Sequence, residues 1–297
     1  MTGFIVKAYR DLMPQSWRDK VYRVFLRKTL NIIRTGNFLI KTKWFYFLSC
    51  FIVFSNEKYK AWSFLGRYGK TQNPGIDILQ YENVSIEIFI DQENKMPFII
   101  HHNKRLYFPL KYKDNIENIY KTLLIEQDEK SAHRYVDSYT IFNGKIMLDI
   151  GAAEGILALE VIDYVDYLYI FECEHDWINA LKATFSPWEN KVEVIEKFVS
   201  DIDDENNITL DSFFRDKNID NIFIKMDIEG AEYKALQGAS FVLSNAKNLD
   251  FSICLYHHED DYIVIPEYLE KYGYKCVTTK GYLLIDWWLR KGVIRNI

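Results

Sequence analysis

The feature that most constrains the fold is the alternation, after residue 145, of short apolar runs with helix-forming segments. The runs are IMLDI (146–150), YLYIFEC (167–173), VEVIEKF (192–198), NIFIKMDI (221–228) and LDFSICLY (249–256). Strands separated by helices form parallel sheets with both faces covered, which makes such strands mostly apolar. We therefore expect an α/β fold with a mostly parallel sheet in this part of the chain.

Two further parts precede this sheet. Residues 1–70 show helical spacing of apolar residues and end near the breaker cluster GRYGKTQNPG (66–75). Residues 71–113 contain the short runs VSIEIFID, PFIIHH and RLYFPL, which predict a small antiparallel β-meander. The predicted organisation is thus a helical, basic and aromatic region (1–70), a meander (71–113) and a Rossmann-like domain (114–297).

Charge is distributed unevenly along the chain. Residues 1–60 hold 12 Lys and Arg and three acids, about +9, within a chain of net charge −5. This segment could contact an anionic membrane surface or a glycan-assembly partner, or form a solvated helical arm. Nucleic acid is not an expected partner, because the rest of the chain is acidic and carries no recognition motif.

The longest apolar run, WFYFLSCFIVF (44–54), is shorter than the roughly 20 residues that cross a bilayer. It is expected to be buried, to lie at a membrane surface, or to form a homodimer interface. The N-terminus mixes charge too finely for a signal peptide, and four scattered cysteines fit a reducing compartment. We expect a cytoplasmic protein, with peripheral association at the inner face of the membrane as an option.

A turn with the spacing Asp-x-Gly-x-x-x-Gly follows the first run, at Asp149, Gly151 and Gly155, and it includes Ala152 and Glu154. It places backbone N–H groups at the carboxyl end of the sheet, where α/β folds bind ligands. The spacing differs from the dinucleotide fingerprint. An acid at its start favours a cation such as S-adenosylmethionine (SAM), while other Rossmann-like uses stay open.

Further cofactor contacts are expected from neighbouring segments. Glu172 ends the second run, where an acid suits ribose hydroxyls; the alternative is a solvated strand-end acid. The segment EQDEKSAHRY (126–135) supplies Glu126, His133 and Tyr135, which belong either to a cover over the ligands or to a solvated helix face. Ser200, after the third run, is either a contact to the adenine edge or an ordinary loop residue.

The chain resembles the FkbM-type family of SAM-dependent methyltransferases over roughly residues 120–285. The resemblance lies in the ordered motifs LDIGAAEG, FECE, ITLDSF, IKMDIEGAEYKALQGA and ICLYHHEDDYIVIPEYLEKYGY. It implies a class I methyltransferase fold with a mostly parallel seven-stranded sheet, SAM as cofactor, and methylation of a hydroxyl, often on a sugar. EQDEKSAHRY resembles a segment of members associated with surface polysaccharide synthesis, which suggests a glycan acceptor. Ala153 stands where many members carry Asn, which would remove one polar contact.

Methyl transfer to an alcohol requires alignment of the reactants and a base or a metal. Asp227 ends the fourth run and is a catalytic and cofactor-binding candidate, or else a helix cap; Glu229 follows it. Adjacent strand residues point to opposite faces, so only one of His257 and His258 should enter the site. We favour His257 as general base or acceptor-orienting group, although strand-end histidines are often structural. No metal is required by this scheme, but Asp227, Glu229 and His257 could bind Mg²⁺.

Two other functions stay open at the level of sequence. One is methylation of a small secondary metabolite or lipid hydroxyl. The other is a non-catalytic, methyltransferase-like adaptor in glycan assembly. The acids at three successive strand ends argue against the adaptor, because a scaffold has no chemical need for them; they are Asp149, Glu172, Asp227 and Glu229.

Overall fold

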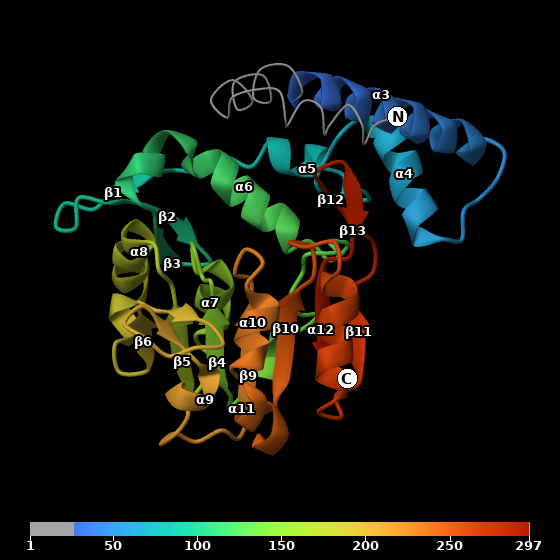
Figure 1. The fold of residues 1–297 in the computed structure, drawn as a ribbon. Helices are drawn as coiled ribbons and strands as arrows, with labels where there is room; N and C mark the ends of the chain where they lie inside the picture. Colours follow the sequence, from blue (N-terminus) through green and yellow to red (C-terminus); the bar gives the residue numbers. More distant parts are fainter. Residues whose placement is uncertain (1–26, 297) are drawn as a thin grey trace, which may run out of the picture. The chain divides into compact units, whose positions relative to one another are not determined.

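The computed structural model describes residues 27–296 of the chain (Figure 1). Residues 1–26, where the predicted helical basic region begins, lie outside the described residues. Within the described part, the chain forms two compact units. One consists of residues 27–74 with 284–289, and the other of residues 75–283 with 290–296.

The first unit is built on helices α3 (Arg27–Ser49) and α4 (Glu57–Tyr68), with residues 284–289 completing it. Asn56 caps α4 by accepting a hydrogen bond from the Lys58 N–H. The two helices pack very closely at Gly66, where a β-carbon would lie 2.1 Å from the Thr42 carbonyl oxygen. Phe38 of α3 packs edge-on against Trp62 and Trp287. No helix within residues 27–296 is both long and apolar enough to span a membrane.

The second unit begins with a short helix, α5 (Leu79–Glu82), and the predicted small antiparallel sheet. Its strands are β1 (Phe89–Ile90), β2 (Pro97–His101) and β3 (Lys104–Tyr107), paired in that order. The turn η2 (Leu110–Asn115), helix α6 (Ile116–Glu126) and turn η3 (Tyr139–Phe142) then lead to the large sheet. The meander is anchored on the domain, since the Tyr107 N–H donates to the buried Thr184 hydroxyl.

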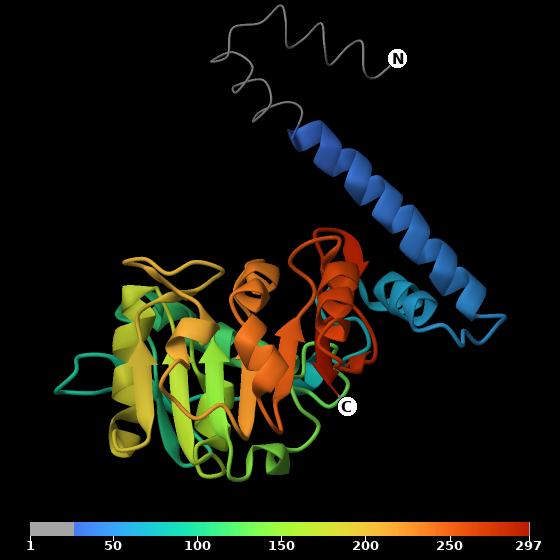
Figure 2. The ribbon, with the colours of Figure 1, turned by 60° about the horizontal axis from the view of Figure 1, so that its bottom comes forward.

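The large sheet has seven strands in the order β11-β14-β10-β9-β4-β5-β6. The bounds are β4 (Ile146–Ile150), β5 (Tyr167–Phe171), β6 (Val192–Ile195), β9 (Ile222–Met226), β10 (Asp250–Cys254), β11 (Cys276–Thr278) and β14 (Val293–Asn296). β14 pairs antiparallel with β10 and β11, whereas the central strands are parallel. Figure 2 shows the central strands side by side. This confirms the mostly parallel, seven-stranded class I methyltransferase sheet that the sequence resemblance implied.

Helices cover both faces of this sheet, as its alternating side chains require. One core joins Met147, Leu168 and Phe223 to α7 (Ile156–Val161), α8 (His175–Phe185) and the meander. The other joins the opposite strand faces to α9 (Leu210–Phe213), α10 (Glu232–Gln237), α11 (Ser240–Asn245) and α12 (Asp261–Glu270). Short elements complete the chain: η4 (Ser186–Trp188), the pair β7 (Phe198–Val199) and β8 (Asn207–Ile208), and the hairpin β12 (Leu283–Ile285) and β13 (Trp288–Arg290).

Candidate active site

Two adjoining cavities lie at the carboxyl ends of β4, β5 and β9. The larger, about 460 Å³, is bordered by Glu172 and Ser200. The smaller, about 80 Å³, is bordered by Glu126, Tyr135, Asp149, Ala152, Glu154 and Lys225. Gly151, Ala153 and Asp227 border both cavities. This is the edge of an open α/β sheet at which ligands bind.

The glycine turn after β4 has a backbone that few residues could adopt. Gly151 has a φ of +75°, and a β-carbon there would lie 2.0 Å from the Asp227 carbonyl oxygen. Gly155, at +71°, lets α7 begin beside Leu181, which a β-carbon would approach to 2.6 Å. Ala153 also has a positive φ, +46°, a region that asparagine tolerates better than alanine. The turn therefore needs glycine at both motif positions, and its alanine is strained.

Glu172 ties the ends of β4 and β5 together. Its Oε2 accepts a hydrogen bond from the Ala153 N–H at 2.9 Å, and its Oε1 accepts from the N–H groups of Cys173 and Glu174. The carboxylate borders the larger cavity. Glu174 differs, because its exposed side chain pairs with Lys111. Of the two neighbouring acids, only Glu172 is thus built into the turn.

A buried ion pair between Lys225 and Asp149 underlies the smaller cavity. The Lys225 Nζ lies 2.9 Å from Asp149 Oδ1 and donates to the Gly151 carbonyl at 2.5 Å. Burial alone would lower the pKa of Lys225, but Asp149 and Asp227 outweigh it and raise the pKa, so the ammonium stays charged. Among the described residues that border the smaller cavity, Lys225 is the one cation.

Besides Asp149 and Asp227, two further acids border the smaller cavity. Burial raises the pKa of Glu154 to about 7, and it also raises the pKa of Glu126 at the end of α6. Desolvated carboxyl groups of this kind are stabilised when a cation binds beside them. The smaller cavity is therefore suited to an ammonium group next to three acids, with Lys225 available to an anion.

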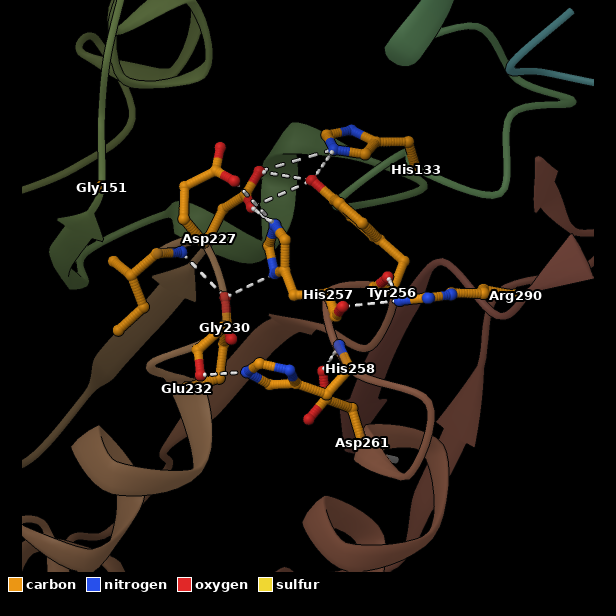
Figure 3. Close-up of polar contacts among 12 residues, drawn as sticks. His133, Gly151, Asp227, Gly230, Glu232, Tyr256, His257, His258, Asp261 and Arg290 are labelled. Atoms are coloured by element: carbon orange, nitrogen blue, oxygen red, sulfur yellow. Dashed lines mark hydrogen bonds and ion pairs between the residues drawn. The ribbon is translucent and has the colours of Figure 1, made fainter. Parts of the chain in front are cut away.

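Asp227, directly after β9, is the centre of a dense hydrogen-bonding network (Figure 3). It accepts hydrogen bonds from the hydroxyls of Tyr135 at 2.8 Å and Tyr256 at 3.0 Å. The Nε2 atoms of His133 and His257 each lie 3.5 Å from its carboxylate oxygens. Burial would raise the pKa of Asp227, but His133, Lys225 and His257 together bring it well below its usual range. Asp227 therefore stays ionised.

His257 lies between two acids. Its Nε2 faces Asp227, and its Nδ1 lies 2.9 Å from Oε1 of the fully buried Glu232. Burial would lower the pKa of His257, but Glu232, Asp227 and Glu229 raise it above the ordinary value. The ring therefore has Nδ1 on the Glu232 side and Nε2 on the Asp227 side. Arg290 fixes the local backbone by donating to the carbonyls of Tyr256 and His257 at 2.6 and 2.5 Å.

The neighbouring candidates differ from these central residues. The His258 ring points away from Asp227 and its Nε2 lies 3.0 Å from the Gly230 carbonyl, so His257 is the histidine of the site. Glu229 is at the rim, with a side chain 94% exposed and 3.7 Å from His257 Nε2. Both oxygens of Asp227 already have tyrosine donors within hydrogen-bonding distance. Of the predicted metal set, Asp227 and Glu229 each lie near His257, but Asp227 already accepts two tyrosine hydroxyls. The described side chains here that are close enough together to hold an ion are Asp227, Glu232 and His257, with Glu232 in place of the predicted Glu229.

The structure brings most of the predicted site residues together. Ser200 borders the larger cavity, and its hydroxyl donates to Asp201. His133 is buried behind Asp227 and does not border either of the two described cavities. Sequence reasoning did not identify the roles of Lys225, Glu232, Tyr256 and Arg290. A lysine inside an apolar run was the one signal that could have marked Lys225; Arg290 had none.

Comparison with known proteins identifies the family. Residues 99–276, more than half of the chain, match the model of the methyltransferase FkbM domain. The chain belongs to the FkbM methyltransferase family. This confirms the resemblance found in the motifs, and the family implies SAM as the cofactor. The cavities at the strand ends fit that cofactor.

Some solved structures of other proteins resemble this chain in fold at low sequence identity. A methyltransferase FkbM from Methylobacillus flagellatus KT is 17% identical with a TM-score of 0.43, over 63% of this chain and 54% of its own. This chain therefore covers about half of that protein. A precorrin-6y C5,15-methyltransferase from Geobacter metallireducens GS-15 is 14% identical with a TM-score of 0.36, over 54% and 84% of the chains.

The N-terminal domain of human METTL16, in complex with SAH, is 14% identical with a TM-score of 0.37, over 59% and 68% of the chains. No match was found among curated proteins. Likenesses this distant carry no argument about the acceptor of this chain.

Proposed function

We propose that this chain is an O-methyltransferase whose acceptor is a hydroxyl of a sugar or glycan in surface polysaccharide synthesis. The observation that carries the proposal is the ion pair of His257 with buried Glu232, while its Nε2 lies 3.5 Å from Asp227, the residue that borders both cavities. A hydroxyl must lose its proton as it attacks a methyl group, and a histidine oriented by an acid is suited to accept that proton.

Each residue of the network has a distinct role in this proposal. When bound, SAM supplies an electrophilic methyl group on a positively charged sulfur. His257 Nε2 takes the proton of the acceptor hydroxyl, and Glu232 stabilises the resulting imidazolium through Nδ1. Asp227 stays ionised and holds the hydroxyls of Tyr135 and Tyr256 in place. Arg290 fixes the backbone that carries the base.

The cofactor would be bound by the two cavities in two halves. Glu172, in the larger cavity, is placed for ribose hydroxyls, with Ser200 near the adenine end. The smaller cavity offers Asp149, Glu154 and Glu126 to the amino group and Lys225 to the carboxylate. These pairings satisfy each charge of the amino acid portion with an opposite one.

A polar groove on α6 supports a hydroxyl-rich acceptor. It measures about 310 Å³ and is lined by Asn115, Asn118 and Thr122, side chains that hydrogen-bond to hydroxyls. Glu126 and Glu154 border this groove as well as the smaller cavity. A sugar in the groove would therefore be next to the cofactor. This scheme needs no metal. We further propose that the protein is cytoplasmic.

A transfer assay with methyl-labelled SAM tests the proposal. The panel would contain nucleotide sugars, oligosaccharides, lipid alcohols and small phenols, each with and without EDTA. Label in a sugar hydroxyl, insensitive to EDTA, would support the proposal. Label only in a lipid alcohol or phenol would show that the sugar acceptor is wrong. SAM binding by calorimetry without transfer to any acceptor would favour the adaptor.

A further inference from the structure

Helix α3 has two apolar faces, and only one of them is covered by α4. Phe38 and Thr42 are 6% and 1% exposed and form the face that packs against α4. On the opposite side lie Ile33, Ile40, Trp44 and Phe47, which recur at helical spacing. A helix normally buries its apolar positions against a core or a membrane. The second apolar face of α3 is exposed in the described structure.

The uncovered face is broad and continuous. Ile33, Ile40, Trp44, Phe47 and Phe51, the apolar stripe, are 54%, 73%, 58%, 55% and 73% exposed. Within it, the centroid of the Phe47 ring lies 6.2 Å from that of Trp44 and 5.1 Å from that of Phe51. The following loop adds Ile52 and Val53, which is 98% exposed. Contiguous apolar surfaces of this kind mark interaction sites, whereas isolated exposed apolar residues do not.

The charge around the apolar stripe selects the type of partner. Residues 27–74 contain nine Lys and Arg and a single acid, Glu57, in a chain of net charge −5. Arg34, Lys41 and Lys43 are on α3 itself and are exposed. A second copy of the chain would bring the same positive charge to the contact, which opposes association. An anionic surface would be attracted instead.

We propose that α3 binds in the plane of an anionic lipid bilayer, with the apolar stripe inserted and the basic side chains at the lipid headgroups. Interfacial helices combine these features, an apolar face with aromatic residues and a basic border, and need not span the bilayer. Trp44 suits the headgroup level, because its ring is amphipathic. The inference is independent of the acceptor, and it would place the methyltransferase domain at a membrane surface.

Vesicle sedimentation tests this proposal on the full chain. Vesicles of phosphatidylcholine alone would be compared with vesicles containing phosphatidylglycerol, at low and high salt. We expect binding to the anionic vesicles that weakens with salt. The triple variant Ile40→Ser, Trp44→Ser, Phe47→Ser should lower the partition coefficient at least ~10-fold.

The matched control changes exposed apolar residues of the other unit: Ile202→Ser, Phe241→Ser, Val277→Ser, at positions 53%, 52% and 44% exposed. This variant should bind vesicles like the unmodified chain. SAM titration of both variants verifies the fold and keeps this test separate from the proposed function. Absence of vesicle binding, or equal loss in both variants, would overturn the proposal. A concentration-dependent dimer abolished by the α3 variant would replace the membrane with a second copy.

Discussion

The two sides of the proposed active site, one for the cofactor and one for the base, are built differently. The cofactor side consists of the glycine turn (149–155) and Glu172, two short stretches joined mainly by hydrogen bonds to the backbone. The base side consists of side chains at 133, 135, 227, 232 and 256–257, joined mainly to each other. The first depends on local conformation, and the second on the arrangement of four separate segments. The cofactor side should therefore govern binding, and the base side the rate.

The largest effect is expected on the base side. His257→Asn removes the proton acceptor and should lower kcat about 10²- to 10⁴-fold, while the Kd for SAM changes little. Labelled methyl transfer and calorimetry measure the two quantities. His258→Asn is the matched control, since that ring contacts only the Gly230 carbonyl among the contacts described. Equal losses in both variants would contradict the assignment of His257.

The next largest effect is expected for the buried ion pair of Lys225 and Asp149, which joins β9 to β4. Lys225→Met leaves the buried carboxylate of Asp149 without its partner, which should lower the free energy of unfolding by about 3–5 kcal/mol. Denaturant unfolding measures this loss. The double variant Lys225→Met, Asp149→Leu removes both charges and should recover much of the stability. A double variant as unstable as the sum of the single ones would show that the pairing is unimportant.

A smaller effect is expected on the cofactor side. Glu172→Gln replaces a charged acceptor of backbone N–H groups and should weaken SAM binding ~10- to 100-fold, since hydrogen bonds to charged groups contribute about 1.5–3 kcal/mol. Calorimetry provides the Kd. Glu193→Gln, at an exposed acid of β6 that borders neither cavity, should leave it nearly unchanged. If kcat fell but the Kd did not, the division between the two sides would be wrong.

The smallest effect is a shift in pH dependence. The pKa of His257 is raised above 6.5, so the ring is protonated below that pKa and the rate should rise with pH through it. Glu232→Gln removes the nearest negative charge and lowers this pKa, so the rise in kcat/KM should move about one unit toward lower pH. Glu229→Gln should shift it less, because the Glu229 side chain is 94% exposed. An unshifted profile in Glu232→Gln would exclude the pairing.

Most strands of the sheet could be predicted from the sequence, because a buried strand is a short apolar run. IMLDI and NIFIKMDI contain β4 and β9, and the glycine turn follows β4 as expected. The run VEVIEKF was less predictable, since the sheet strand ends at Ile195 and Phe198 begins the separate strand β7. The edge strands β11 and β14 were not among the predicted runs, because β11 has only three residues and β14 pairs with the distant strand β10.

Site residues could be predicted from the sequence where their role depends on neighbouring residues in the chain. Gly151, Gly155 and Glu172 are recognisable because a backbone conformation or a strand end requires them. The contact between His257 and Glu232 depends on how α10 packs beside the end of β10, which no local pattern records. Arg290 is more distant still, since its role is to hold two carbonyl groups 33 and 34 positions away.

The close approach at Gly151, where a β-carbon would lie 2.0 Å from the Asp227 carbonyl oxygen, has a consequence for redesign. Because the turn touches the backbone of Asp227, any larger residue at position 151 would displace the end of β9 and the Asp227 carboxylate that follows it. The glycine turn and the loop after β9 are therefore coupled at position 151. Libraries that vary this position alone should yield mostly inactive protein. New acceptor specificity is better sought on α6, where Asn118 and Thr122 line an open groove without this restriction.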